Sequence, residues 1–255
     1  TGPTGSGKTT TLYAFLKKIY TPDIKVITIE NPIEYHIEGI VQTQAEERKG
    51  YTFAEGLRSV LRQDPDVIMV GEIRDNETAT VAVNAALTGH LVLSTLHTNN
   101  AAGSFPRLLD LGVNAKVISS ALNVSIAQRL ARKLCQACKK EIPLEGASKE
   151  VVDKILTKIL DPIYLENIQR EHLWTAVGCP ECTGLGFKGR IGVYEAIFVN
   201  QEIEKAVIIN PSERDIREAA KSQKLLTLVE DGVIKVLMGI TTLEELDRVV
   251  DLSSI

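Results

Sequence analysis

The sequence has no long hydrophobic run and few aromatic residues. None of its stretches approaches the roughly 18 consecutive apolar residues that a membrane-spanning helix needs, so we expect no segment that crosses a bilayer. Aromatic residues make up 5% of the chain, and a formal net charge of −4 creates no global basic field. These features argue against a nucleic-acid-binding protein, although a local basic patch stays compatible with them.

Cysteine is also scarce. The chain has four, arranged as Cys135-x₂-Cys138 and Cys179-x₂-Cys182. Two such pairs favour a tetrahedral Zn²⁺ site with all four thiolates as ligands, rather than disulfides, as expected in a reducing compartment. A redox motif would normally show one C-x-x-C, whereas an iron–sulfur cluster also uses four thiolates and stays an alternative.

The segment between the two cysteine pairs is long. Its 40 residues exceed the spacing of a compact zinc ribbon, so we expect it to loop out as a subdomain. Apolar residues at helical spacing predict a short amphipathic helix in this segment: Val151, Val152, Ile155, Leu156 and Ile159.

The first residues form a phosphate-binding motif. Residues 2–9 read G-P-T-G-S-G-K-T and fit G-x-x-x-x-G-K-[ST] at every fixed position. Glycines allow backbone N–H groups to surround phosphate oxygens, Lys8 can reach the β- and γ-phosphates of ATP, and the Thr9 hydroxyl can bind Mg²⁺. The predicted nucleotide-binding residues are Gly2, Pro3, Thr4, Gly5, Ser6, Gly7, Lys8, Thr9 and Thr10. Because such a loop follows a buried strand, we expect that strand to precede residue 1 in a longer protein.

The sequence after the loop alternates between helical and strand patterns, and this context favours a true phosphate-binding loop over a chance match to the motif. Helical apolar spacing occurs at Leu12, Phe15, Leu16 and Ile19, again over residues 53–61, and in the segment 76–88 that ends before Gly89. Short apolar runs at residues 26–29, 67–70 and 91–95 are typical of buried parallel strands. The pattern predicts an α/β fold of the RecA-like P-loop class, with a mainly parallel sheet covered on both faces.

Polar residues follow the predicted strands, at the edge where ligands of open α/β sheets bind. Glu30 is a candidate general base that orients a water against the γ-phosphate, although Glu30 and Glu34 could instead be solvated loop acids. Gly71-Glu72 closes a Walker B-like strand, with Glu in place of the usual Asp. His97 lies in a polar segment after the last predicted strand and is a candidate γ-phosphate sensor.

Together these segments resemble the C-terminal ATPase domain of the secretion-ATPase superfamily, the motors of bacterial type II secretion and type IV pilus assembly. The resemblance rests on residues 2–10 (Walker A), 28–34 (the Asp box, with Asn31 where Asp is usual), 61–75 (Walker B region) and 89–99 (His box). It continues through residues 179–186 and 189–195. Related pilus-retraction motors generally lack the four cysteines, which favours an assembly or export motor.

The resemblance implies further roles. It supports Glu30 as the catalytic glutamate, Glu72 as the Walker B acid acting through Mg²⁺ or its waters, and His97, less firmly His90, as phosphate sensors. Such motors are homohexamers with ATP between subunits, so a neighbour's arginine could stabilise the transition state. Arg58 and Arg62 are the candidates. The alternative is that they pair with Asp64, Asp66 or Glu55.

We divide the chain into an ATPase core (1–132), a tetracysteine subdomain (133–190), and a C-terminal strand and helices (191–255). Capping-box patterns at Ser212-x-x-Asp215 and Thr242-x-x-Glu245 predict helix starts in the last part. The predicted function is ATP hydrolysis that drives protein secretion or pilus assembly. The resemblance implies an inner-membrane platform protein as partner, peripheral membrane association through partners, and a place in the bacterial cytoplasm, at the cytoplasmic face of the inner membrane. For this function no stable nucleic-acid partner is expected. The alternative function is that of a nucleic-acid translocase or a zinc-ribbon nucleic-acid-binding protein.

Overall fold

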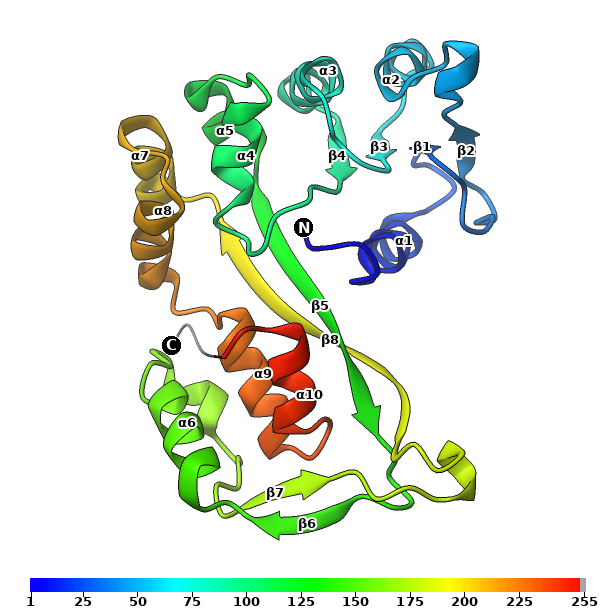
Figure 1. The fold of residues 1–255 in the computed structure, drawn as a ribbon. Helices are drawn as coiled ribbons and strands as arrows, with labels where there is room; N and C mark the ends of the chain where they lie inside the picture. The colour runs from blue at the N-terminus through cyan, green and yellow to red at the C-terminus, as the bar shows by residue number, and fades with distance from the viewer. Residues whose placement is uncertain (253–255) are drawn as a thin grey trace. The chain divides into compact units, whose positions relative to one another are not determined.

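The computed structural model describes residues 1–252, and Figure 1 shows its elements. The chain forms two compact units. The first unit contains Thr1–Gly2, Lys8–Ser125 and Phe198–Ala219, and the second contains Pro3–Gly7, Ile126–Ile197 and the described residues from Ala220 on. No helix within the described residues has both the length and the apolar character that crossing a membrane requires.

The first unit is built on a parallel sheet of four strands in the order β2-β1-β3-β4. The strands are β1 (Val26–Glu30), β2 (Val41–Gln44), β3 (Val67–Val70) and β4 (Leu91–Ser94). Every residue of β1 and β3 is buried, as expected for central strands of a sheet covered on both faces. The prediction of a mainly parallel α/β sheet is confirmed.

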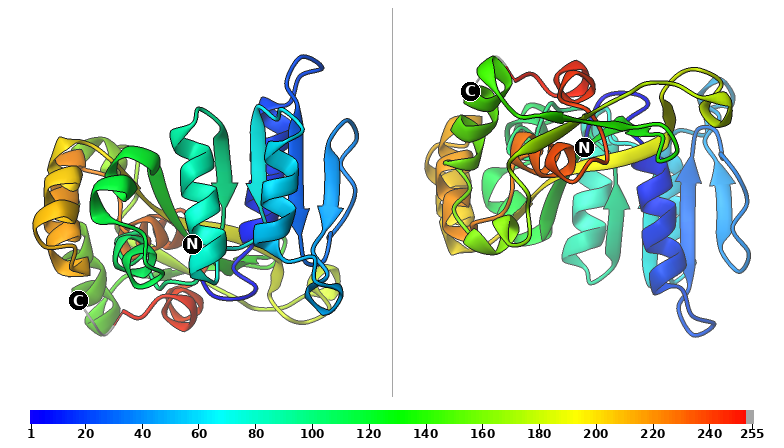
Figure 2. Two further views of the ribbon diagram at one scale, coloured as in Figure 1. Left: turned by 90° about the horizontal axis from the view of Figure 1, so that it is seen from above. Right: turned by 90° about the horizontal axis from the view of Figure 1, so that it is seen from below.

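Helices cover both faces of this sheet. Helix α1 (Lys8–Ile19) lies on one face, while α2 (Phe53–Leu61) and α3 (Asn76–Leu87) lie on the other, as the two views of Figure 2 show. The Thr52 hydroxyl accepts a hydrogen bond from the Glu55 N–H at the start of α2, and the Asp75 carboxylate caps α3 through the Thr78 N–H. These side chains satisfy N–H groups that have no partner inside the helix.

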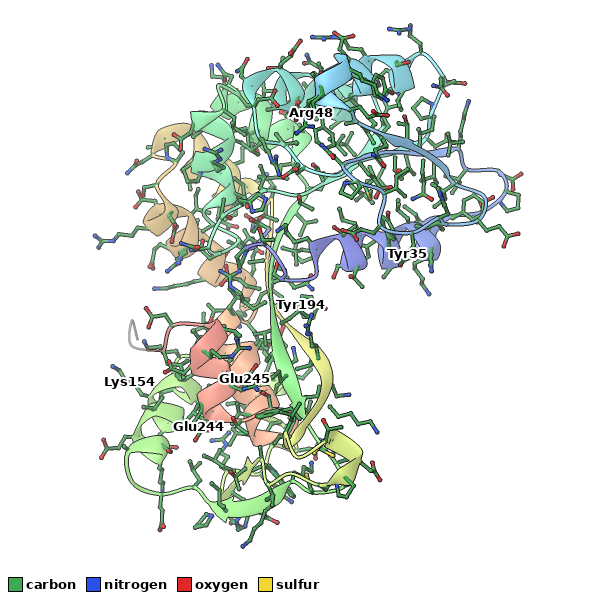
Figure 3. The ribbon with its side chains drawn as sticks, turned by 45° about the vertical axis from the view of Figure 1, so that its right-hand side comes forward. Tyr35, Arg48, Lys154, Tyr194, Glu244 and Glu245 are labelled. Atoms are coloured by element: carbon green, nitrogen blue, oxygen red, sulfur yellow. The ribbon has the colours of Figure 1, made fainter. Side chains whose placement is uncertain are left out.

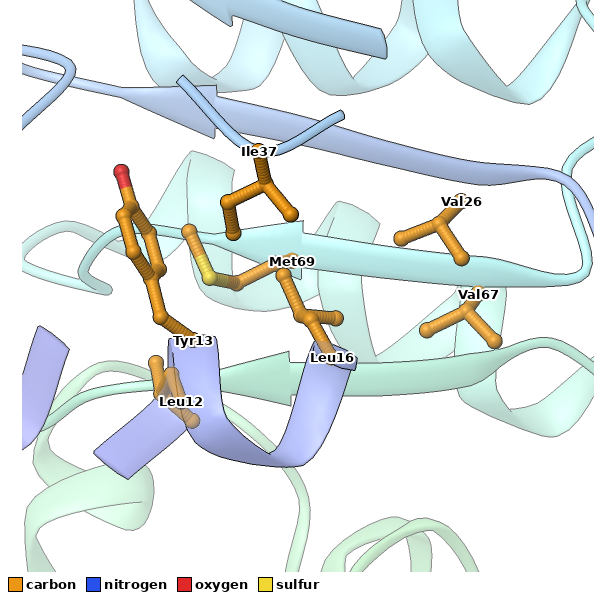
Figure 4. Packing of buried hydrophobic residues seen from close by; sticks show 7 residues of the cluster. All are labelled: Leu12, Tyr13, Leu16, Val26, Ile37, Val67 and Met69. Carbon is orange, nitrogen blue, oxygen red and sulfur yellow. The ribbon is translucent and has the colours of Figure 1, made fainter. Parts of the chain in front are cut away.

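Helix α1 contributes to a core cluster, drawn in Figure 4, that consists of Leu12, Tyr13, Leu16, Val26, Ile37, Val67 and Met69. The predicted apolar face of α1 is correct for Leu12 and Leu16. It is wrong for Phe15, whose exposed fraction is 42%. Tyr13 is fully buried instead, and its hydroxyl donates a hydrogen bond to the Glu30 carboxylate.

The edge strand β2 was not expected from the sequence. Its four residues, VQTQ, include one apolar residue, Val41, and both ends of the strand are exposed. It pairs with β1 in parallel, so that Glu30 lies opposite Gln44. An edge strand needs less apolar surface than a central one, which explains why the apolar runs did not reveal it.

The remaining helices of the first unit are α4 (Ser104–Asp110), α5 (Ala115–Ala121), α7 (Gln201–Ile209) and most of α8 (Glu213–Ala220). Helix α5 contacts both α3 and α7. Helix α8 begins where its capping pattern predicted: the Ser212 hydroxyl accepts from the Asp215 N–H at 3.2 Å and donates to the Asp215 carboxylate at 2.5 Å.

The second unit contains most of β5 (Val124–Leu134), which pairs with β8 (Phe187–Phe198), and it also contains β6 (Lys140–Pro143), which pairs antiparallel with β7 (His172–Thr175). Helix α6 (Gly146–Leu156) packs against α9 (Leu228–Leu237), which also contacts β7 and α10 (Leu243–Val249). The helix predicted between the cysteine pairs is α6, which buries Val152, Ile155 and Leu156. Short 3₁₀ helices lie at Glu47–Lys49, Pro162–Leu165, Pro180–Cys182 and Lys221–Gln223.

Candidate active site and thiol cluster

The carboxyl ends of the parallel strands carry the polar residues that the sequence singled out. Glu30 is the last residue of β1, Glu72 follows β3, and His97 follows β4. Backbone hydrogen bonds join the segments at the carboxyl ends of these strands. The Gly71 N–H donates to the Ile29 carbonyl at 2.8 Å, and the Ile73 N–H donates to the Thr95 carbonyl at 3.0 Å. The sheet therefore gathers these three side chains at one edge of the first unit.

Glu30 is enclosed by hydrogen-bond donors. Its Oε1 accepts from the Thr28 hydroxyl at 2.6 Å and from the Gln42 amide at 3.0 Å, and its Oε2 accepts from the Tyr13 hydroxyl. The residue is 2% exposed. Burial, and then the hydrogen bond and negative charge of Glu30, raise the pKa of Tyr13, so its hydroxyl stays a donor. Because the residue is buried, a water can reach the carboxylate only if one of the side chains around it moves.

Glu72 is more open, with a side chain that is 12% exposed. One of its oxygens lies 2.5 Å from Nε of Arg74 and 3.4 Å from Nε2 of His97. A carboxylate beside a histidine, next to the exits of two strands, can hold a metal-bound water or sense phosphate charge. His90, by contrast, directs its Nδ1 to the Ala85 carbonyl at 3.0 Å and to the Thr88 hydroxyl at 3.2 Å, at the end of α3.

The start of the phosphate-binding motif lies beside the exit of β4. The Gly2 N–H and the Thr1 hydroxyl both donate to the Leu96 carbonyl, at 3.4 and 2.9 Å. The Thr98 N–H in turn donates to the Thr1 hydroxyl at 3.0 Å. Lys8, the first residue of α1, donates from Nζ to the Gly2 carbonyl at 2.8 Å. The first unit thus places Gly2 and Lys8 next to the segment that carries His97.

Residues 3–7 of the motif pack within the second unit. Gly5 and Gly7 have φ of +79° and +87°, a backbone conformation that favours glycine. A Cβ at Gly7 would lie 2.8 Å from the Gln128 amide nitrogen and 3.1 Å from a Leu130 methyl carbon, both on β5. Gly7 therefore meets two requirements at once, a left-handed backbone and a close approach to a strand.

The two arginines proposed to act on a neighbouring subunit, Arg58 and Arg62, differ in whether their side chains are already paired. Arg58 on α2 is paired with Glu55 at 2.9 Å, as the alternative expectation held, and also with Glu77 on α3 at 2.7 Å. Arg62 caps the C-terminus of α2 with its backbone. Its side chain is exposed and makes no ion pair with the described residues. Arg62 is thus better suited to reach a second molecule.

The four cysteines come together in the second unit. Their sulfur atoms all lie within 4.8 Å of one another, and three separations are 3.7–3.8 Å. Four thiolates around zinc with Zn–S bonds of about 2.3 Å would be separated by about 3.8 Å, the edge of that tetrahedron. None of the four, all of which the structure describes, is in a disulfide.

One sulfur of the cluster has backbone support. Cys182 Sγ accepts from the N–H groups of Cys179 at 3.2 Å and Gly186 at 3.1 Å. Burial raises the pKa of the Cys182 thiol, but these N–H groups and the neighbouring thiols outweigh it and lower that pKa to about 6. Burial and thiol hydrogen bonds raise the pKa of Cys138 to about 12. The cluster therefore favours at least one thiolate, the ligand form for a soft metal site.

Sequence reasoning missed the residues that surround Glu30. Tyr13 was not part of the apolar spacing that predicted α1, and Gln42 lies on the edge strand that was not expected. Thr28 could have been found, because residues i and i−2 of a strand share a face.

Known proteins resemble this chain over most of its length. The family model "Type II/IV secretion system protein" matches residues 1–248. The chain is 48% identical over 245 residues to the type IV pilus assembly ATPase PilB of Thermus thermophilus, covering 96% of this chain and 26% of that protein. It is 46% identical over 249 residues to type II secretion system protein E of Pectobacterium carotovorum, covering 98% of this chain and 47% of the relative. The chain thus spans about half or less of these relatives.

Solved structures agree. The pilus retraction motor PilT with bound ADP has a TM-score of 0.67 and 29% identity, over 97% of this chain and 59% of that chain. The ATPase DotB of Legionella pneumophila has a TM-score of 0.64 and 25% identity, over 97% of this chain and 57% of that chain. With the family model matched from residue 1 to residue 248, the chain belongs to the type II/IV secretion system protein family.

Proposed function

We propose that this chain is the ATP-hydrolysing part of a homohexameric motor for type II protein secretion or type IV pilus assembly. The observation that supports this most is the edge of the parallel sheet, where Lys8 and Gly2 lie beside the segment of His97, and His97 pairs with Glu72. The relatives named as pilus assembly ATPase and secretion protein E add the biological setting. The partner would be an inner-membrane platform protein, and the motor would work at the cytoplasmic face of that membrane.

In this proposal the phosphate-binding motif holds ATP, with Lys8 on the β- and γ-phosphates. Glu30 orients the attacking water and accepts its proton, after the Tyr13 hydroxyl or another donor gives way. Glu72 and His97 face the γ-phosphate, and His97 changes partner when that phosphate leaves. Arg62 of one subunit stabilises negative charge in the site of its neighbour.

Two metals are part of the proposal. The Thr9 hydroxyl and the Glu72 carboxylate are the oxygen ligands that Mg²⁺ prefers, and the ion would neutralise charge on the phosphates. Zinc would be held by Cys135, Cys138, Cys179 and Cys182, whose sulfur separations of 3.7–3.8 Å fit a tetrahedral site. Its role is to stabilise the fold of the second unit.

The test separates binding from hydrolysis in the purified full-length protein. Lys8→Ala should weaken ATP binding and lower the hydrolysis rate by about 100-fold or more, because it removes the positive charge that contacts the phosphates. Lys18→Ala is the matched control, since Lys18 lies on the same helix and is exposed. It should behave like the parent protein.

The proposal fails if the parent protein neither binds nor hydrolyses ATP, or if Lys8→Ala and Lys18→Ala have equal activity. A nucleic-acid affinity that falls steeply with salt, together with hydrolysis that depends on added nucleic acid, would favour the alternative of a translocase.

A further inference from the structure

A basic cavity of about 650 Å³ lies in the second unit. One wall is the phosphate loop from Pro3 to Ser6, and the other walls carry four arginines, which are Arg129, Arg132, Arg190 and Arg248. No carboxylate is among its lining residues within the described chain. A chain with a net charge of −4 thus gathers four positive charges next to a phosphate-binding motif. The volume is in the range of small-molecule sites, about 300–1,000 Å³.

Ser6 gives an independent sign of a ligand. The residue lines this cavity and is 4% exposed. Its Oγ is buried and finds no hydrogen-bond partner among the described residues. Buried hydroxyls in folded proteins are nearly always paired, so an unpaired one beside a cavity indicates a group that binds there.

Glu245 on α10 holds two of the arginines in place. Its carboxylate accepts from Nε and Nη2 of Arg132, at 2.9 and 2.7 Å, and from the Arg132 backbone N–H at 2.9 Å. It also accepts from Nε and Nη2 of Arg248, at 2.9 and 2.7 Å. The Glu245 side chain is 1% exposed, and Figure 3 shows it beside its neighbour Glu244. The Arg132 guanidinium also lies over the Phe187 ring, 4.2 Å from its centre.

These contacts fix the direction of the guanidinium groups. A planar guanidinium carries five N–H donors, and those not used by Glu245 remain for another acceptor. Burial raises the pKa of Glu245, but the hydrogen bonds from Arg248 and Arg132 outweigh it and hold that pKa at about 2. Glu245 therefore stays ionised and keeps both arginines oriented at any physiological pH.

We propose that Glu245 is a positioning residue, and that it aims Arg132 and Arg248 at the polyphosphate of a nucleotide that residues 3–6 of the phosphate loop bind in this cavity. The proposal rests on the function proposed above. It adds phosphate contacts from β5 and α10 of the same chain to those of the phosphate loop, and it assigns the Ser6 hydroxyl a phosphate oxygen as partner.

Positioning and simple charge predict opposite results for Glu245→Gln. The substitution removes a negative charge beside the cavity, so electrostatic attraction alone would make ATP bind more tightly. If Glu245 aims the arginines, the freed guanidinium groups lose their geometry and ATP binds more weakly, with a Kd about tenfold higher. Adenosine, which has no phosphate, should keep its affinity within about twofold, because it does not use these contacts.

The experiment measures equilibrium binding of a fluorescent ATP analogue to the purified full-length protein, with competition by ATP and by adenosine. Glu244→Gln is the matched control: it makes the same change one residue earlier, on an exposed side chain. Arg248→Ala is a second variant in case Glu245→Gln does not fold, because the Arg248 side chain is 58% exposed and Glu245 keeps Arg132 as partner. Arg248→Ala should also raise the Kd for ATP, and Arg248→Lys should restore part of the loss.

Several results would overturn the inference. These are unchanged or tighter ATP binding in folded Glu245→Gln, unchanged binding in Arg248→Ala, or an equal loss of ATP and adenosine affinity. If the parent binds ATP and Lys8→Ala does not, while the Glu245 and Arg248 variants match the parent, the inference fails and the proposed function stands. If the parent itself does not bind ATP, both fail.

Discussion

The edge of the parallel sheet and the thiol cluster are held together in different ways. At the sheet edge, Glu30 and Glu72 extend from strands whose every residue is buried, so the sheet places them without any ligand. The thiol cluster is less enclosed. Cys135 and Cys182 are buried, but Cys138 and Cys179 are partly open, and all four residues of β6, which begins two positions after Cys138, are exposed.

This difference separates the roles that a bound group can play. Burial of apolar surface stabilises the first unit, so a ligand at its sheet edge can bind and leave without loss of the fold. Near the cysteines a metal would supply much of the folding free energy itself. The predictions below test this contrast and then refine it.

Metal removal should have the largest effect, and on one unit only. Structural zinc contributes on the order of 10 kcal/mol in small domains, so Cys179→Ser or a strong chelator should remove zinc and open the two-stranded sheet of β6 and β7. Hydrogen exchange should become about 1,000-fold or more faster for β6 and β7 amides, and stay within about threefold for β1 and β3. Elemental analysis checks the metal, with about one zinc per chain in the parent. An equal increase in hydrogen exchange in both units would contradict the contrast drawn between the sheet edge and the thiol cluster.

Replacement of the exposed arginine should have the next largest effect. Arg62→Ala should lower kcat by about 1,000-fold, as expected when a transition-state arginine is removed. Arg58→Ala, whose side chain is already paired with Glu55 and Glu77, should have a much smaller effect. Mixing Arg62→Ala with Lys8→Ala protein regenerates complete sites at mixed interfaces, so activity should partly return. A co-assembled mixture that stays inactive would argue against Arg62 acting in trans.

Glu30→Gln and Glu72→Gln, which replace the two carboxylates at the sheet edge, should each lower kcat by about 100-fold and leave ATP binding largely unchanged. They should differ in stability. In Glu30→Gln the new NH₂ group would face the Thr28 hydroxyl and the Gln42 amide, which now donate to the carboxylate, so the free energy of unfolding should fall by about 1–3 kcal/mol. Glu72→Gln should lose less stability, because the Glu72 side chain is more exposed. Steady-state kinetics and chemical denaturation measure both. Glu38→Gln, on an exposed loop residue, is the control. Parental activity in Glu30→Gln would remove its role as base.

The smallest effect concerns pH and Glu245. The pKa of this carboxyl falls from 4.5 to about 2 on folding, so its contribution to stability is present above pH 4.5 and is lost as the pH falls toward 2. Between pH 6 and pH 4, the stability difference between the parent and Glu245→Gln should shrink by about 0.8 kcal/mol. Denaturation of Glu244→Gln at the same two pH values gives the reference. A difference that does not change with pH would contradict the assigned pKa.

The sequence predicted well what depends on local pattern. Apolar runs placed β1, β3 and β4, Gly89 placed the end of α3, and capping patterns placed the starts of α8 and α10. The spacing of the cysteines predicted a cluster that the fold brings together from residues 44 positions apart. Each of these signals is contained in a few neighbouring residues.

What escaped prediction depends on contacts between distant segments. Thr242-x-x-Glu245 reads as a capping box, and the Glu245 N–H does donate to the Thr242 hydroxyl at 3.1 Å. The Glu245 carboxylate, however, binds Arg132 and Arg248 rather than the helix start. Glu30 likewise meets Tyr13 and Gln42, from α1 and the edge strand. No local pattern reveals which acid finds which partner.

The close approach of Gly7 to Gln128 and Leu130 has a consequence for where the phosphate loop can lie. A Cβ at position 7 would lie 2.8 Å from the Gln128 amide nitrogen, so any other residue there would require the loop or its neighbours on β5 to shift. The lack of a side chain at this one position thus sets how near to β5 the loop can lie. A substitution of Gly7 would displace the loop as well as strain its backbone, whose φ is +87°.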